Sequence, residues 1–503
     1  MLFFSALVLL IITTPLTAKI NFYQNDDWVY YRMAANFMQG NFMLDPISAP
    51  TFYSQGFLAA LFSFIFGINR LPFLTLVFSV SNYLLVAFIC YRFLIKRLVP
   101  SILVGLIVFF NPWHAYSIWG FMTENYFLAF LLAAILCFLY FDETKKFRYF
   151  IFICVFSLLA FLVRQVALVL PISLVGYYIL KRELRPALYS GLLSVFILSF
   201  YLFLFPKTPE MVEKGLQFQH LFMFDYSYAL VYGTLIMLVA VVLPLVFGAF
   251  EYTEFKKSPV RLALFVLLGS GLYFLLSHYF KPGVVSWGEF PYFENVWERT
   301  GFYPRGILGT KYHFSGIYDL YLYWDLTAKI LLSIFIAYWL VFKRKIVNFF
   351  FIFGLLYLGL MILTLSFHGR YLLVLVPIFI FYLLTLKIRF NFVQLAVTSG
   401  FVVFLGLLSY QFSMDFVLSN RYVWDKSREL VAAQKIEPKM VEGANAWKLT
   451  YRNLARNYLY EFSYDSQRVN KDYASSFTLV EKNPITFPFS LFVDPNIYLY
   501  RRN

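Results

Sequence analysis

The sequence predicts an all-α polytopic membrane protein with about 13 transmembrane helices, followed by a small α+β domain outside the membrane. Hydrophobic residues make up 61% of its 503 residues and charged residues only 14%, whereas charged residues reach about 25% in an ordinary soluble domain. One crossing of a bilayer takes about 20 apolar residues. The composition therefore excludes a soluble protein and suffices for roughly a dozen crossings or more.

The expected transmembrane helices are apolar runs that are long enough, or nearly long enough, to cross a bilayer. In chain order the runs cover residues 1–19, 71–95, 98–118, 120–141, 148–163, 166–180, 186–206, 225–250, 260–280, 325–342, 346–366, 371–386 and 391–411. The first run also resembles the apolar core of a secretory signal ending at Thr17 and Ala18, although no basic segment precedes it. The sequence leaves its cleavage open.

Basic residues mark every second connection between these runs. If the N-terminus is cytoplasmic, the cytoplasmic connections are the basic ones, at residues 96–97, 145–148, 181–185, 256–261, 343–345 and 387–389. This alternation follows the positive-inside rule, and it accounts for the net charge of +15 without a nucleic-acid partner. It predicts a multi-pass protein of the cytoplasmic (plasma) membrane whose C-terminus lies outside.

The composition changes sharply after residue 412. Of the last 91 residues 23 are charged, against 46 of the first 412. We therefore expect a transmembrane domain over 1–412, with long outer loops at 20–70 and 281–324, and an extracytoplasmic domain over 413–503. The three cysteines lie in apolar runs and have no spacing typical of disulfides or zinc sites; they are Cys90, Cys137 and Cys154.

Two adjacent carboxylates, Asp26 and Asp27, directly follow the first run. One interpretation is that one of them caps the first turn of a surface helix, which stabilises a helix by about 1 kcal/mol. The other is that one is a general base or a metal ligand. A carboxyl group partly shielded from water has its pKa raised toward the range that is useful for proton transfer.

Four more ionisable residues lie at the predicted outer ends of spans. Glu124 opens a span, where an acid either complements the helix dipole or positions a ligand. Arg164 lies between two short runs, and an ionisable group inside a membrane needs a partner. His368 and Arg370 precede a late span. A guanidinium binds phosphate bidentately, but an interfacial Arg also reaches lipid headgroups.

Several motifs together resemble GT-C glycosyltransferases, closest to the protein O-mannosyltransferases and the lipid A aminoarabinose transferases. The first outer loop carries Asp-Asp-x-x-Tyr-x-x-x-Ala at 26–34, a Pro and aromatic stretch at 49–53, Phe-Gly at 66–67 and Arg-Leu-Pro at 70–72. Later motifs agree: Met-Thr-Glu at 122–124, Leu-Val-Arg at 162–164 and Gly-Arg-Tyr-Leu-Leu at 369–373. The family pair is usually Asp-Glu, and this chain has Asp-Asp.

The resemblance implies a GT-C fold and the transfer of one sugar from a polyprenyl-phosphate donor, with inversion, to an acceptor hydroxyl outside the membrane. The acceptor is a lipid, glycan or protein. By register Asp26 is the general base, with Asp27 as the alternative. Arg370, His368 and Arg164 are expected to bind the donor phosphate.

Glu124 and Tyr30 are expected to position the acceptor or a metal. A divalent cation held by Asp26, Asp27 and Glu124 stays an open alternative. Two alternative functions stay open. One is a transporter or flippase of lipid-linked glycans, and the other is a GT-C polymerase or oligosaccharide ligase. Motifs for ATP hydrolysis and zinc peptidases are absent from the sequence.

Overall fold

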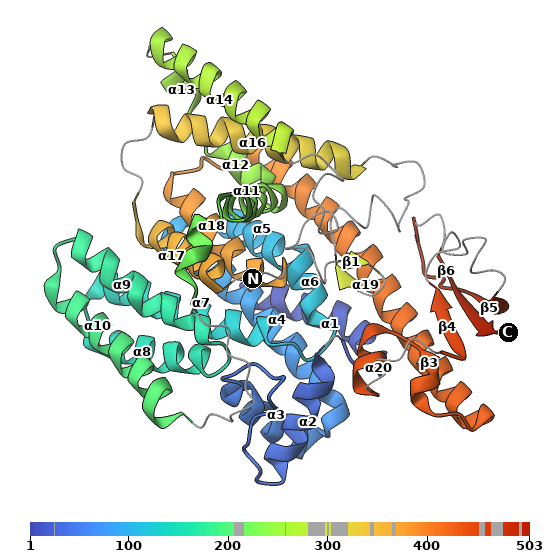
Figure 1. Cartoon of the computed structure of the whole chain (residues 1–503). Coiled ribbons are helices and arrows are strands. Elements are labelled where there is room, and N and C mark those ends of the chain that lie inside the picture. Colours follow the sequence, from blue (N-terminus) through green and yellow to red (C-terminus); the bar gives the residue numbers. More distant parts are fainter. Residues whose placement is uncertain are drawn as a thin grey trace.

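The computed structural model is mostly helical (Figure 1). It describes residues 1–24, 26–205, 216–256, 258–279, 297–298, 301–302, 320–342, 347–364, 369–451, 458–463, 476–491 and 495–503. Most of the predicted outer loop 281–324 and His368 lie outside the described residues, and so does the side chain of Arg370. Residues 297–298 and 301–302 of that loop form two short antiparallel strands, β1 (Trp297–Glu298) and β2 (Gly301–Phe302), and residues 320–324 already belong to the helix α16 (Leu320–Phe342).

The apolar helices follow the predicted runs closely. They are α1 (Leu2–Thr17), α4 (Leu71–Ile89), α5 (Leu98–Phe109), α6 (Pro112–Ile118), α7 (Glu124–Thr144), α8 (Phe147–Phe161), α9 (Val169–Leu180), α10 (Leu184–Ser199), α11 (Phe224–Val241), α12 (Leu243–Gly248), α14 (Pro259–Tyr279), α16 (Leu320–Phe342), α17 (Phe349–Thr364), α18 (Leu375–Thr385) and α19 (Phe392–Gln434). Short helical turns continue four of them: η2 (Cys90–Leu94), η3 (Gln165–Leu168), η4 (Phe200–Leu204) and η8 (Gly369–Val374).

Within the described part of the chain, six helices are long and apolar enough to cross a membrane, and a seventh crossing results if α5 and α6 count as one bent span. Seven further apolar helices are shorter, with 10–17 residues. A helix needs about 20 residues for a full crossing, although the range extends down to about 17. The structure thus has the helices of a membrane-embedded protein, and the number of 13 crossings stays a prediction.

The expected span over 98–118 is bent and consists of two helices. It breaks between α5 and α6 with a bend of 66°. Pro112 is the first residue of α6, and the Asn111 side chain accepts a hydrogen bond from the Trp113 N–H. Proline cannot donate the helical hydrogen bond and favours the first turn of a new helix. The break therefore turns α6 away from the axis of α5.

The segment predicted as the first outer loop folds as two helices packed against each other, α2 (Asp27–Met38) and α3 (Tyr53–Phe66) (Figure 1). The turn η1 (Ile68–Arg70) then leads into α4. The far end of α3 exposes Leu61, Phe64 and Ile65, of which Phe64 is 82% exposed. A short helix with such a face is suited to lie at a membrane surface.

The helix α19 passes the predicted domain boundary at Ser413 without a break. Its 43 residues span about 65 Å at 1.5 Å per residue, roughly twice the hydrocarbon thickness of a bilayer. The second half therefore carries the C-terminal elements, as Figure 1 shows. The helix begins with a hydrogen bond to the Asn391 side chain and ends at Lys435, which adopts a left-handed conformation.

The C-terminal elements form a small sheet of four strands beside α19. The order is β3-β4-β6-β5, with β3 parallel to β4 and the other pairs antiparallel. The strands are β3 (Val441–Glu442), β4 (Tyr460–Ser463), β5 (Phe477–Pro484) and β6 (Asn496–Arg502), and α20 (Asn445–Thr450) lies between β3 and β4. This confirms the expected small sheet at the C-terminal end.

Candidate active site

Asp27 is the first residue of α2, and its side chain is fully buried. Its Oδ2 atom accepts two backbone hydrogen bonds, from the Gln24 N–H at 3.1 Å and from the Phe121 N–H at 2.8 Å. Within the described residues its Oδ1 atom has no hydrogen-bond partner. One carboxylate oxygen thus ties the first outer loop to the connection between α6 and α7, 94 residues further along the chain.

The connection between α6 and α7 fits closely around this carboxylate. A Cβ atom on Gly120 would overlap both Asp27 Oδ2 and Gln24 Oε1. The Gln24 side chain in turn donates to the Tyr116 carbonyl at 2.8 Å. Only glycine permits the backbone to approach Asp27 this closely, so Gln24, Asp27 and residues 116–121 form one interlocked unit.

Two adjacent residues of the first outer loop join it to two other predicted motifs. The Ser54 N–H donates to the Leu162 carbonyl at 2.9 Å. The Gln55 side chain donates to the carbonyls of Phe121 and Met122, at 3.3 and 3.4 Å. The start of α3 therefore lies between the Met-Thr-Glu motif and the Leu-Val-Arg motif.

Glu124, Arg164 and Tyr371 meet beside this junction. Glu124 is 3% and Arg164 16% exposed, and Arg164 Nη1 lies 3.3 Å from Glu124 Oε1. The Arg164 guanidinium stacks over the Tyr371 ring, with its Cζ 4.2 Å from the ring centroid. The Tyr357 hydroxyl donates to the Tyr371 carbonyl at 3.0 Å. Four segments far apart in the sequence, near Asp27, Glu124, Arg164 and Tyr371, thus converge at one end of the helix bundle.

Burial raises the pKa of the Asp27 carboxyl well above its usual range. The two backbone N–H donors act in the opposite direction but do not compensate, and the negative charges of Asp26 and Glu124 raise the pKa further. A buried carboxylate with only two donors loses more hydration than it regains. Asp27 therefore favours its neutral form more than an exposed aspartate does.

The neighbouring Asp26 differs from Asp27 in access. Asp26 is the N-cap residue of α2 and is partly exposed. Its side chain makes no capping hydrogen bond to the first turn of α2, within the described residues, so the cap interpretation of the sequence does not hold in its usual form. A general base must come within hydrogen-bond distance of the proton that it removes, and of the two carboxylates Asp26 is the accessible one.

Tyr30, Arg370 and His368 are the remaining residues that the sequence predicts for the site. Tyr30 is buried and stacks on Phe52, with ring centroids 4.7 Å apart, so its ring is part of the packing between α2 and the start of α3. The backbone of Arg370 belongs to η8, one residue before Tyr371. Because η8 contacts both α6 and α7, the Arg370 backbone lies on the same side of the bundle as the cluster of Glu124, Arg164 and Tyr371. His368 lies outside the described residues.

The described residues do not assemble a metal centre. Nowhere in the described part of the chain do three or more His, Cys, Asp or Glu side chains gather closely enough to hold a metal ion. One oxygen of Asp27 accepts hydrogen bonds from two backbone N–H groups, and Glu124 forms an ion pair with Arg164. Asp26, Asp27 and Glu124, the three carboxylates predicted as possible ligands, thus do not form a ligand set within the described residues.

Several residues of this region escaped the sequence analysis. They are Gln24, Ser54, Gln55, Gly120 and Phe121, which connect the motifs through backbone and amide hydrogen bonds. A polar Gln55 at the start of an apolar helix was the one usable signal, because a buried amide needs partners. Gln24 takes part through its backbone N–H and its side-chain amide, whereas Ser54 and Phe121 take part through backbone atoms, which no residue type reveals.

No protein-family model matches this chain, and no curated protein or solved structure is significantly similar to it. The assignment of a function therefore depends on the geometry of the site and on the residue motifs.

Proposed function

We propose that this protein is a membrane glycosyltransferase of GT-C type. It transfers a single sugar from a polyprenyl-phosphate donor to an acceptor hydroxyl on the outer side of the cytoplasmic membrane. The observation that supports the proposal most is the convergence of four distant motifs. They are linked by the hydrogen bonds from Phe121 to Asp27 and from Ser54 to Leu162, by the Glu124–Arg164 ion pair and by the stacking of Arg164 on Tyr371.

Each residue has a defined task in this proposal. The acceptor oxygen attacks the anomeric carbon, the bond from that carbon to the phosphate oxygen breaks, and Asp26 takes the proton of the acceptor hydroxyl. Asp27 does not contact the sugar; it positions the first loop, and with it Asp26, against the α6–α7 connection. Inversion follows because the attack comes from the face opposite the departing phosphate.

Arg164 stabilises the charge that develops on the departing phosphate, together with Arg370 and His368. A guanidinium has five N–H donors in a rigid fork, so its bond to Glu124 fixes its orientation without using all of them. Fixed cations at the place where charge develops are among the largest contributions to catalysis. Glu124 and Tyr371 hold this cation from two sides.

The experiment that tests the proposal offers purified protein in lipid nanodiscs a panel of radiolabelled polyprenyl-phosphate sugars together with membrane extract. We expect label from at least one donor to appear in a lipid, glycan or protein fraction as a covalent product. Protein with a normal thermal unfolding transition that transfers label from none of the donors would contradict the proposal.

One observation favours a second candidate, a transporter or flippase of lipid-linked glycans. Within α16, Lys329 pairs with Asp325 at 2.6 Å, and their side chains are 6% and 13% exposed. Buried ionisable pairs inside a span are typical of substrate or ion pathways. In sealed vesicles, donor that crosses the membrane without forming a covalent product would favour this candidate over transfer.

A further inference from the structure

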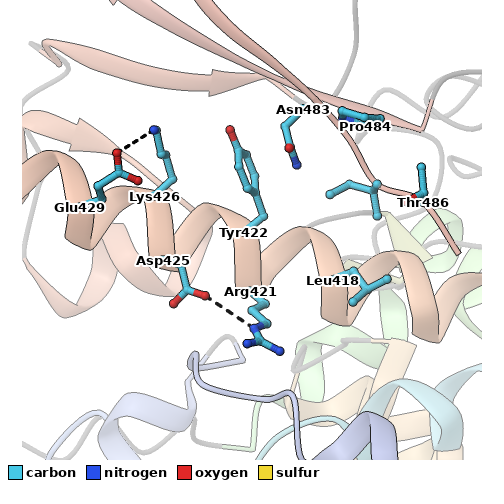
Figure 2. A pocket seen from close by; sticks show the side chains of 10 residues that line it. Leu418, Arg421, Tyr422, Asp425, Lys426, Glu429, Asn483, Pro484 and Thr486 are labelled. Atoms are coloured by element: carbon cyan, nitrogen blue, oxygen red, sulfur yellow. Dashed lines mark hydrogen bonds and ion pairs between the residues drawn. The ribbon is translucent and has the colours of Figure 1, made fainter.

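A pocket of about 400 Å³ lies outside the candidate active site, between the second half of α19 and the end of β5. Residues 418–429 of α19 form one side, and residues 483–486 form the other. Figure 2 shows Tyr422 standing on the side of α19 that faces the sheet, with Asn483 above it and Lys426 next to it. Arg421 and Asp425 also line the pocket, but their side chains lie on the side of the helix that faces away from the sheet.

The charges that line the pocket cancel. Arg421 Nε lies 3.6 Å from Asp425 Oδ2, and Lys426 Nζ lies 2.9 Å from Glu429 Oε1. A site for a phosphate or another anion needs a surplus of cations, and a site for a cation needs a surplus of acids. With two cations and two anions in its lining, this pocket suits a neutral ligand that offers both hydrogen-bond donors and acceptors.

Tyr422 gives the pocket a fixed aromatic wall. Its hydroxyl donates to Glu481 Oε1 at 2.7 Å, and Lys426 Nζ lies 3.0 Å from Glu481 Oε2. These contacts from β5 hold the Tyr422 ring in place, while the ring itself is only half-buried. A preorganised ring binds a flat apolar surface without a further loss of side-chain freedom.

The remaining wall alternates between apolar and polar groups. Leu418, Pro484 and Ile485 supply apolar surface, whereas Asn483 supplies an amide and Thr486 a hydroxyl. A sugar ring presents the matching surfaces, C–H faces for stacking and hydroxyls that both donate and accept.

The pocket is connected to the segment that leads to Asp27. Asp425 Oδ1 accepts from Asn21 Nδ2 at 2.8 Å, and Arg428 Nη2 donates to the Asn21 carbonyl at 2.7 Å. Asn21 and Asp27 are six positions apart in the chain, so their Cα atoms are at most about 20 Å apart. A chain of a few sugar units is long enough to bridge such a distance.

We infer that the pocket between α19 and β5 binds a neutral oligosaccharide. That this oligosaccharide belongs to the acceptor of sugar transfer is a consequence of the proposed function and stands or falls with it. The binding of sugar to this pocket is a separate statement, because it depends on Tyr422, Asn483 and the balanced charges alone.

The test measures binding of three neutral trisaccharides, mannotriose, maltotriose and chitotriose, by saturation-transfer NMR and calorimetry, with trigalacturonic acid as the anionic comparison. The full chain is held in nanodiscs, because alkyl glycoside detergents are themselves sugars. We expect at least one neutral trisaccharide to bind with a Kd near or below about 1 mM, and trigalacturonic acid to bind more weakly. Tyr422→Ala should weaken binding about tenfold or more, which corresponds to ~1.4 kcal/mol.

Two further variants make the result specific. Tyr410→Ala is the matched control, because Tyr410 also lies on α19 and also contacts the C-terminal elements, through the Pro488 carbonyl, but lies outside the pocket; binding should be unchanged. Asn483→Ala changes the opposite wall and should weaken binding even if Tyr422→Ala lowers stability.

The inference is overturned if none of the neutral trisaccharides binds to folded protein, if Tyr422→Ala and Asn483→Ala both bind as the wild type does, or if trigalacturonic acid binds best. The assay of sugar transfer is independent of these results. Trisaccharide binding without any transfer would support the pocket and contradict the proposed function, and transfer without trisaccharide binding would do the reverse.

Discussion

Asp27 allows the sharpest test of how the site is held together. Asp27→Ala removes the acceptor of the Gln24 and Phe121 N–H groups and leaves both donors buried without it. An unsatisfied buried donor costs about 1–3 kcal/mol, so the two together cost about 2–6 kcal/mol. Asp27→Asn retains one oxygen that can accept both bonds, and we expect a loss of about 1 kcal/mol or less.

The stability of the folded protein should also depend on pH, in a direction that follows from the pKa of Asp27. Burial raises the pKa of Asp27 in the folded protein above its value in the unfolded chain, which is about 3.9. A raised folded-state pKa contributes stability that is complete below the unfolded pKa and is lost as pH rises toward the folded pKa. The stability of the wild type relative to Asp27→Asn should therefore fall as pH rises above about 4.

The assay is thermal unfolding in nanodiscs at several pH values from about 4 upward. Glu437→Gln is the control, because the Glu437 side chain is 66% exposed and its replacement should leave the unfolding temperature nearly unchanged. Equal unfolding temperatures for Asp27→Ala and Asp27→Asn, or a difference between wild type and Asp27→Asn that does not vary with pH, would refute the reasoning.

The other predictions concern the ion pair, the glycine contact and the topology. Arg164→Ala should lower the stability by about 3 kcal/mol, because it leaves the buried acid Glu124 without this cation. The control is Arg92→Ala, which should cost about 0–1 kcal/mol, because the two side chains of that ion pair are 40% and 44% exposed. Equal unfolding temperatures for the two variants would contradict this prediction. Gly120→Ala should lower the stability by about 1–3 kcal/mol through overlap with Asp27 and should also reduce sugar transfer. Gly400→Ala should do neither, because a Cβ atom there meets no neighbouring atom. Wild-type stability and activity of Gly120→Ala would contradict the importance of the close contact. A cysteine at the exposed position of Lys482 should react with an impermeant thiol reagent added to intact cells and one at the exposed position of Lys146 should not; reversed labelling would contradict the predicted orientation.

The positions of the apolar helices could be predicted from hydropathy, because each run is bounded by charged or helix-breaking residues. The break inside 98–118 was missed even though its signal is present in the sequence. Asn111 followed by Pro112 is a typical helix start, but in an apolar stretch of bilayer length the hydropathy pattern outweighs it. In the structure the Trp113 N–H donates a capping hydrogen bond to the Asn111 side chain, which stabilises the start of the second helix.

The different environments of Asp26 and Asp27 could not be predicted from the sequence. Both are aspartates at the start of the same helix, and which one turns inward is decided by the Phe121 N–H, 94 residues away. Contacts of this separation depend on how α6 and α7 pack. The pocket between α19 and β5 is similar, since the bond from Tyr422 to Glu481 joins residues 59 positions apart.

The measurement that tests the account most directly compares Asp26→Asn with wild type in the transfer of radiolabel from the active polyprenyl-phosphate sugar. Asn retains the shape of Asp26 but cannot accept the proton of the acceptor hydroxyl. We predict an unchanged unfolding temperature, unchanged donor binding and a transfer rate lowered by about 100-fold or more. A transfer rate within about twofold of wild type, in protein of normal stability, would contradict the assignment of Asp26 as the general base.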